Sequence, residues 1–189
     1  TEAELKPLLH TWSLSLEVQF YIFFSFFLFL IIKLKRKWVI AITILIFLLS
    51  LLISIWGSIN KPIANFYLLP SRGWEFLIGF FLAYLNIFDQ NYLSRIKNEM
   101  LCLVGLCMII FTSFFYNGYT PYPSLYSLLP TLGTALLIIC MKPNTFIFKV
   151  FNLKIFVLLG LISYSAYLWH FPMIVFTKIL FGHHLTLST

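Results

Sequence analysis

Three short clusters of polar residues interrupt a sequence that is otherwise dominated by apolar side chains. The first cluster contains His10, Ser13, Glu17 and Tyr21, whose spacings of three and four residues predict one shared helix face. A histidine and a carboxylate on one face are suited to general acid–base catalysis, and the carboxylate can orient the imidazole. A structural interpretation stays open, in which the histidine lies at a membrane interface and the glutamate complements the helix dipole.

The second cluster lies at a predicted helix start. Pro70 and Ser71 are typical of the first residues of a helix, and Arg72 and Glu75 follow at a spacing that allows them to pair. In the functional interpretation, Arg72 holds an anionic or carbonyl group and Glu75 positions it. In the structural interpretation, the two form a self-satisfied ion pair that anchors the helix end. Gly79 is expected to allow the close approach of a neighbouring helix.

The third cluster lies near the end of the chain. Ser163, Tyr167 and His170 are predicted to share one helix face. Pro172 cannot donate a backbone hydrogen bond to the carbonyl of Leu168, which predicts a kink beside His170. These residues could line a path across a membrane, or His170 could be an ordinary packing residue with its hydrogen bonds satisfied.

The composition places all three clusters in a lipid bilayer. Hydrophobic residues make up 61% of the 189 positions and charged residues 10%, and the mean hydropathy is +0.95. Soluble domains have roughly 45–50% apolar and about 25% charged residues. The net charge of +7 also occurs in nucleic-acid-binding proteins, but here the basic residues sit in short groups between apolar runs. The sequence shows no nucleic-acid motif, and its three cysteines lack the spacing of a metal site.

Apolar runs predict an all-α, polytopic bundle of about six transmembrane helices. A hydrocarbon core of roughly 30 Å requires about 20 apolar residues in helical form. The predicted spans are Leu14–Ile32, Trp38–Trp56, Ser71–Phe88, Met100–Tyr116, Ser124–Met141 and Ile155–Leu180. No internal repeat or soluble domain interrupts them, so residues 1–189 are expected to form one transmembrane domain.

Basic residues between the spans predict the orientation in the membrane. One side carries nine basic residues, which are Lys33, Lys35, Arg36, Lys37, Arg95, Lys97, Lys142, Lys149 and Lys154. The opposite side carries four, which are Lys6, Lys61, Arg72 and Lys178. The positive-inside rule therefore places the first set in the cytoplasm. Both ends of the chain, together with the first two polar clusters, are expected on the outer face.

Four sequence blocks in this order resemble the acyltransferase 3 family of integral membrane acyltransferases. The blocks are PLLHTWSLSLEVQFY, PSRGWEFLIG, PTLGT and GLISYSAYLWHFP, at residues 7–21, 70–79, 130–134 and 160–172. The first block departs from the family pattern, because the family usually has two acidic residues before the glutamine and Val18 occupies the second position. A carboxylate role in this block therefore depends on Glu17 alone.

The resemblance implies an activity and a set of site residues. Family members transfer acyl groups, often acetyl, from acyl-CoA at the cytoplasmic side to hydroxyls of exported glycans such as lipopolysaccharide O-antigen and peptidoglycan. It implies a bacterial inner-membrane enzyme with acetyl-CoA as donor, a glycan or lipid-linked saccharide as acceptor, and no metal. The catalytic candidates are His10, Glu17, Arg72 and Glu75. The candidates for the substrate path are Trp12, Ser13, Tyr21, Trp74, Ser163, Tyr164, Tyr167 and His170.

The resemblance also implies that part of the machinery lies outside these residues. The family carries a basic residue and a histidine on N-terminal helices that have no counterpart here, so the chain is expected to belong to a longer protein and to be inactive alone. In the expected mechanism, a histidine takes the proton of the sugar hydroxyl while nearby donors stabilise the oxyanion. A non-catalytic transporter or flippase, or a membrane scaffold, remains an alternative, and the order of the motifs favours the enzyme.

Overall fold

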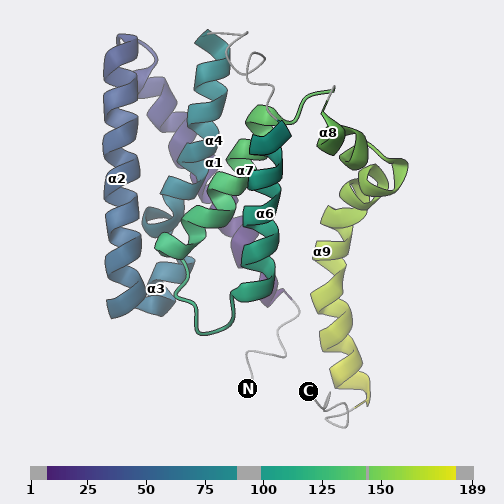
Figure 1. Ribbon diagram of the computed structural model, residues 1–189. Coiled ribbons are helices and arrows are strands. Elements are labelled where there is room, and N and C mark those ends of the chain that lie inside the picture. The colour runs from purple at the N-terminus through teal and green to yellow at the C-terminus, as the bar shows by residue number, and fades with distance from the viewer. Residues whose placement is uncertain (1–7, 89–98, 144, 182–189) are drawn as a thin grey trace. The chain divides into compact units, whose positions relative to one another are not determined.

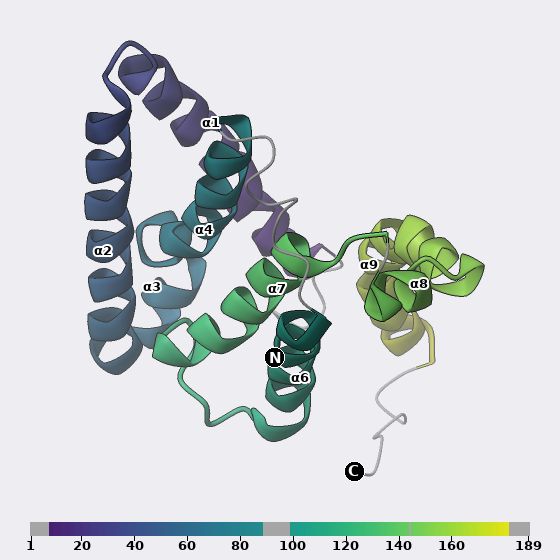
Figure 2. The same ribbon diagram turned by 45° about the horizontal axis from the view of Figure 1, so that its top comes forward.

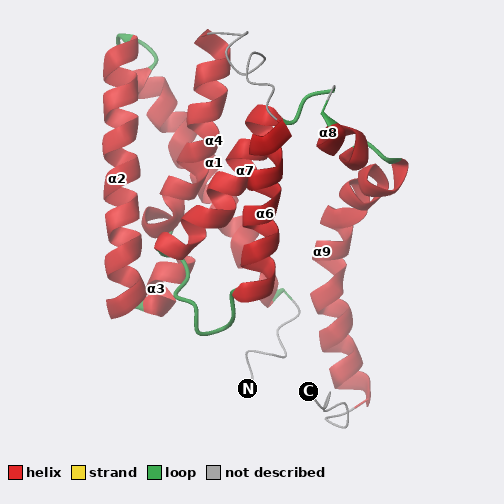
Figure 3. Cartoon of the chain, in the orientation of Figure 1, coloured by secondary structure: helices red, strands yellow, loops and turns green. Residues whose placement is uncertain are grey.

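The computed structural model describes residues 8–88, 99–143 and 145–181, and its regular secondary structure in these ranges is helical (Figures 1 and 3). This confirms the predicted all-α class. The helices are α1 (Trp12–Ile31), α2 (Arg36–Asn60), α3 (Pro62–Tyr67), α4 (Leu69–Phe88), α6 (Glu99–Phe115), α7 (Leu128–Cys140), α8 (Phe146–Phe151) and α9 (Lys154–Phe181). Short 3-10 turns, η2 (Leu9–Thr11) and η3 (Leu125–Ser127), precede α1 and α7.

A helix occupies each of the six segments predicted to span the membrane. Three of them, α1, α2 and α9, are long and apolar enough to cross a membrane. The apolar helices α6 and α7 are shorter, with 17 and 13 residues. At 1.5 Å per residue, α7 extends for about 20 Å, which is less than the roughly 30 Å of a hydrocarbon core. The number of crossings therefore stays a prediction.

The chain divides into two compact units. The smaller unit combines Thr1–Glu17 with Phe151–Thr189, and the larger unit is Val18–Val150. The first turns of α1 thus belong with α9, and the remainder of α1 belongs with α2 to α8. The first and third polar clusters contribute to the smaller unit, and the second lies in the larger one.

The larger unit has small and polar residues at the buried positions of α2 and large apolar residues at its surface. The buried positions of this helix are Val39, Thr43, Ser50, Ser54 and Gly57. Leu45, Leu49 and Leu52 on the same helix are exposed. Small residues at helix contacts and large apolar ones outside are typical of helices that pack within lipid.

Glycines allow α6 and α7 to cross at close range. A Cβ added at Gly105 would lie 2.7 Å from the carbonyl oxygen of Gly133, and one added at Gly133 would lie 2.8 Å from that of Gly105. The two backbones are therefore in direct contact. The prediction that Gly79 serves a close helix approach was wrong, because a Cβ there would meet no atom within 4 Å.

Asn65 connects α2, α3 and the loop that precedes α7. Its buried side chain donates from Nδ2 to the carbonyl oxygens of Ser54 at 3.1 Å and Pro123 at 2.9 Å. In turn, the hydroxyl of Ser71 donates to the carbonyl oxygen of Asn65 at 2.5 Å. The α6–α7 loop and α3 lie at the same end of the unit in both views (Figures 1 and 2). These bonds bring Tyr122 to the first turns of α4.

Candidate active site

The predicted pairing of Arg72 with Glu75 is present in α4. Arg72 donates from Nη2 at 3.1 Å and from Nε at 3.3 Å to Oε2 of Glu75. Only 13% of the arginine side chain and 12% of the glutamate side chain are exposed. A charge at this position is tolerable because each group is neutralised and hydrogen-bonded by the other.

Tyr122 is a third member of this cluster that the sequence did not reveal. Nη2 of Arg72 donates to the Tyr122 hydroxyl at 2.6 Å. The guanidinium carbon also lies 5.0 Å from the centre of the Tyr122 ring and 5.8 Å from that of Phe66, which are cation–π distances. Tyr122 is 50 residues from Arg72 in sequence, so no helical spacing could connect them.

The Tyr122 hydroxyl is held in its protonated form. Desolvation raises the pKa of Tyr122 and the Glu75 carboxylate adds to the increase, whereas Arg72 opposes it. The phenol is therefore neutral at physiological pH, and it accepts from Arg72 while keeping a proton of its own. The structure shows no acceptor for that proton among the described residues.

Glu75 lines a cavity between α4 and α7, and one of its carboxylate oxygens is unpaired. The cavity has a volume of about 340 Å³, and Tyr122 is also among its lining residues. Oε1 of Glu75 is buried and has no hydrogen-bond partner within the described ranges. A buried acceptor without a donor is costly. Two residues that line this cavity therefore have unused hydrogen-bonding capacity, an acceptor on Glu75 and a donor on Tyr122.

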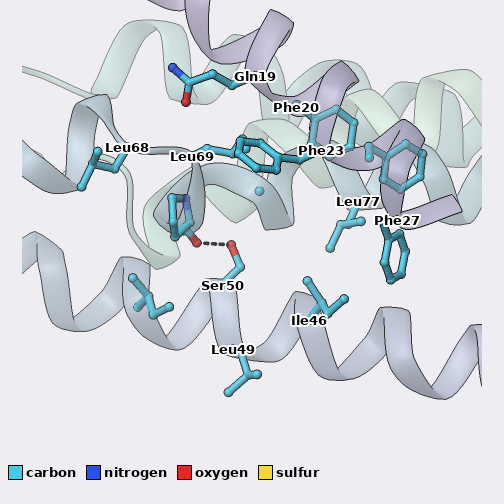
Figure 4. Close-up of a pocket in the computed structure, with 14 residues that line it drawn as sticks. Gln19, Phe20, Phe23, Phe27, Ile46, Leu49, Ser50, Leu68, Leu69 and Leu77 are labelled. Carbon is cyan, nitrogen blue, oxygen red and sulfur yellow. Dashed lines mark hydrogen bonds between the residues drawn. The ribbon is translucent and has the colours of Figure 1, made fainter. Parts of the chain in front are cut away.

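Trp74 lies in the contact between α2 and α4, where it is fully buried. Its backbone N–H donates to the hydroxyl of Ser50 at 3.0 Å, and that hydroxyl donates to the carbonyl oxygen of Pro70 at 2.6 Å (Figure 4). Its ring meets that of Phe47 nearly at a right angle, with centres 6.2 Å apart. This position suits packing better than the predicted contact with substrate.

A second and larger cavity, of about 500 Å³, lies between α1, α2 and α4 (Figure 4). Phenylalanines of α1, including Phe20, Phe23 and Phe27, form one wall, and leucines and isoleucines of α2 and α4 form the others. None of its lining residues is titratable. Of these two cavities, only the smaller one is therefore lined by groups capable of acid–base chemistry.

In the smaller unit, the first and third polar clusters are joined at Tyr167. Its hydroxyl donates to the backbone carbonyl of His10 at 2.6 Å and lies 2.6 Å from the hydroxyl of Ser13. A phenol carries one proton, and this one is used on His10, so Ser13 must be the donor in the second bond. The sequence predicted the two clusters separately and did not predict that they meet.

The imidazole rings of His10 and His170 meet edge to face beside this junction. The ring centres of His10 and His170 are 5.1 Å apart. Nδ1 of His170 lies 2.6 Å from the carbonyl oxygen of Tyr167, and because a carbonyl only accepts, we assign the proton to Nδ1. In the neutral ring, Nε2 is then a proton acceptor. Both ring nitrogens of His10 are buried without a hydrogen-bond partner among the described residues.

The predicted acid–base pair of His10 and Glu17 is not formed. His10 belongs to the 3-10 turn η2, and α1 begins only at Trp12, so the α-helical spacing does not extend back to the histidine. Its ring instead contacts Tyr167, His170 and other groups of α9. Within the described ranges, no hydrogen bond or ion pair reaches the half-buried Glu17.

The remaining predicted residues do not gather at either cluster. Tyr21 is 61% exposed on α1, and Tyr164 is exposed on α9. The Ser163 hydroxyl donates to the carbonyl oxygen of Gly160 one turn earlier in its own helix, at 2.7 Å. Trp12 is half-buried at the start of α1. Helix α9 continues through Pro172 as one element from Lys154 to Phe181, and the kink beside His170 stays a prediction.

Comparison with known proteins places this chain in a family. Residues 2–188 match the profile of the acyltransferase domain family, the acyltransferase 3 type that the four sequence blocks resemble. The chain belongs to the acyltransferase 3 family. As a family member with three helices that are long and apolar enough to span a bilayer, it is an integral membrane protein.

Curated relatives are named for acyl transfer. The peptidoglycan O-acetyltransferase OatA of Listeria monocytogenes is 30% identical over 90% of this chain and 29% of its own length. The Bacillus subtilis protein named "Putative peptidoglycan O-acetyltransferase YrhL" is 28% identical over 89% of this chain and 28% of its own. "Putative membrane-bound transacylase BcsY" of Komagataeibacter xylinus is 32% identical over 92% of this chain and 43% of its own. The chain thus spans less than half the length of each. No solved structure matches it significantly.

Proposed function

We propose that this chain forms part of a membrane O-acyltransferase that moves an acyl group, acetyl in the first instance, to a hydroxyl of a bacterial surface glycan. The observation that carries the proposal is the polar end of the α4–α7 cavity. Oε1 of Glu75 needs a donor and the Tyr122 hydroxyl needs an acceptor. An attacking sugar hydroxyl supplies the donor, and the carbonyl oxygen of an acyl group supplies the acceptor.

The proposed reaction gives each member of the cluster a role. The sugar hydroxyl donates to Oε1 of Glu75 and its oxygen attacks the acyl carbonyl carbon. The Tyr122 hydroxyl donates to the carbonyl oxygen as negative charge develops there, and the Arg72 bond to the same hydroxyl strengthens that donor. The carbon–sulfur bond of the thioester breaks and the sulfur leaves with a proton. The Glu75 carboxylate takes the hydroxyl proton and passes it to the leaving sulfur.

The partners follow from family membership and from the names of the relatives. We assign the donor role to acetyl-CoA and the location to a bacterial inner membrane, as in the family pattern. Peptidoglycan is the acceptor to test first, because two relatives carry it in their names. Lipopolysaccharide O-antigen, or a lipid-linked precursor of either glycan, is the next acceptor.

Mass spectrometry of surface glycans from cells with and without the full-length gene tests this function. We expect the deletion to remove an acetyl increment from peptidoglycan fragments and a plasmid copy of the gene to restore it. Identical peptidoglycan and O-antigen in the two strains, together with altered uptake or export of a saccharide, would instead support the transporter alternative.

A further inference from the structure

The cavity between α4 and α7 changes from polar to apolar along its length. Glu75 and Tyr122 lie at one end, beside the first turns of α4. Leu82 of α4 and Ile138 of α7 also line it. Both helices start at the end of the unit where α3 lies (Figure 1), so residues later in each helix lie farther from that end. A ligand that fits this cavity has a polar group beside Glu75 and Tyr122 and a hydrocarbon part that extends along α4 and α7 toward Leu82 and Ile138.

Gly79 keeps the middle of this cavity open. The glycine lines the cavity one turn beyond Glu75 on the same face of α4. A Cβ built at this position would meet no atom within 4 Å. A larger side chain at this position would therefore enter the cavity without displacing a neighbouring helix.

We propose that this cavity holds the hydrocarbon chain of the transferred acyl group, with Gly79 limiting the longest chain that the enzyme accepts. This inference rests on the proposed function. It assigns a binding site to the hydrocarbon chain of the acyl group, next to the site proposed for the acyl carbonyl. An acetyl group needs only the part of the cavity beside Glu75 and Tyr122, whereas each further methylene extends past Gly79 toward Leu82. Apolar contact along that path stabilises longer chains, because each further methylene is removed from water.

The dimensions favour an acyl chain over a membrane lipid tail. From Glu75 to Leu82 the helix rises about 10 Å, which is shorter than the roughly 15 Å of half a hydrocarbon core. The volume of about 340 Å³ is more than twice that of the roughly 150 Å³ apolar cavity known to admit benzene. A chain of several carbons therefore fits.

Acyl-chain selectivity of the full-length protein tests the inference. Wild type, Gly79→Ala, Gly79→Leu and Gly160→Leu are assayed with acetyl-, butanoyl- and hexanoyl-CoA and a peptidoglycan fragment as acceptor. Gly160 is the matched control, because a Cβ there also meets nothing within 4 Å and the residue does not line the cavity. Wild type should transfer all three chains. Gly79→Leu should lower the ratio of hexanoyl to acetyl transfer at least about tenfold, as expected when methylenes are excluded from a pocket.

Three results would each overturn the inference while leaving the proposed function intact. One is a wild-type enzyme that transfers acetyl but refuses hexanoyl. The others are an unchanged ratio of hexanoyl to acetyl transfer in Gly79→Leu, and a change of the same size in Gly160→Leu. Absence of acetyl transfer by the wild type would instead contradict the proposed function itself, and the inference with it.

A labelling experiment provides a readout that does not depend on turnover. Gly79→Cys is prepared in a full-length protein whose Cys102, Cys107 and Cys140 are replaced by alanine, and its alkylation by a maleimide is timed. Hexanoyl-CoA should slow alkylation more than acetyl-CoA does, because only the longer chain covers residue 79. Equal rates with both thioesters would contradict the inference, as would protection by bilayer lipid alone, which would identify a lipid tail as the occupant.

Discussion

Arg72 shows how a single charged side chain is held at the end of a membrane helix. Its guanidinium donates to a carboxylate and a phenol and lies over two aromatic rings. The carboxylate was predictable, because Glu75 lies three residues away on the same helix. The phenol of Tyr122 was not, because it comes from a loop whose position depends on distant hydrogen bonds. Local spacing thus predicted half of this cluster.

Replacing Arg72 by lysine should show whether acyl transfer needs only the positive charge at this position or also the geometry of the guanidinium group. An ammonium keeps the charge but cannot reproduce the planar arrangement of Nε and Nη2 donors on Glu75 and Tyr122. We expect acyl transfer to fall by about tenfold or more, the rate equivalent of roughly 1.4 kcal/mol, at unchanged protein abundance. The same substitution at Arg36, on the exposed start of α2, is the control. Equal activities of the two variants would show that acyl transfer does not depend on the Arg72 guanidinium.

Tyr167 should hold the start of α1 to α9. Tyr167→Phe removes the bonds to the His10 carbonyl and the Ser13 hydroxyl, which we expect to lower the free energy of unfolding by about 1–2 kcal/mol. Tyr164→Phe, on an exposed face of the same helix, is the control. Thermal unfolding in detergent measures both, and a stability of Tyr167→Phe equal to that of Tyr164→Phe would contradict this role.

The interpretation of His10 shows where residue spacing misleads. Its predicted partnership with Glu17 assumed that the α-helix includes both residues. The helix begins two residues after His10, and the preceding 3-10 turn directs the imidazole to α9. Such contacts between the two ends of a sequence carry no periodic signal.

Among the elements, the long helices were predictable and the short ones were not. Runs of apolar residues locate α1, α2, α4, α6, α7 and α9 to within a few residues. The six-residue helices α3 and α8 are too short to give such a run, and each makes a contact with a residue distant in sequence, Asn65 of α3 with Pro123 and Phe146 of α8 with Glu99. Gly105 and Gly133 define the α6–α7 crossing, but the sequence alone could not show that they face each other.

Asn65→Asp tests the connection between α3 and the loop of Tyr122. Aspartate keeps the shape of asparagine but cannot donate to the Ser54 and Pro123 carbonyls when it is ionised. We expect stability to fall by about 2 kcal/mol or more and acyl transfer to fall with it, because Tyr122 loses its anchor. The control is Asn60→Asp, whose amide makes one exposed bond to Trp56 within α2. If Asn65→Asp transferred acyl groups as fast as this control, the Asn65 hydrogen bonds would not be what positions the loop that carries Tyr122.

At the scale of the whole molecule, the distribution of charge predicts an orientation that places the Arg72 cluster outside. The α6–α7 loop contains Gly118, around which a Cβ would meet no atom within 4 Å. In a background without native cysteines, Gly118→Cys should react with an impermeant thiol reagent on intact cells or spheroplasts. Leu34→Cys, between α1 and α2, should react only after permeabilisation. The reverse pattern would place the cluster at the cytoplasmic face and contradict the predicted orientation.

The central claim is that the Arg72–Glu75–Tyr122 cluster carries out acyl transfer, and ester-bound acetate on peptidoglycan tests it most directly. A strain lacking the gene is complemented with full-length wild type, Glu75→Gln or Glu99→Gln, at equal membrane abundance. Glu99, at the exposed start of α6, is the matched control because a glutamine there still accepts the Phe146 N–H. We predict that Glu75→Gln lowers acetate by about tenfold or more, because an amide oxygen still accepts a hydrogen bond but cannot take the hydroxyl proton as a carboxylate does. Wild-type acetate with Glu75→Gln would contradict the account.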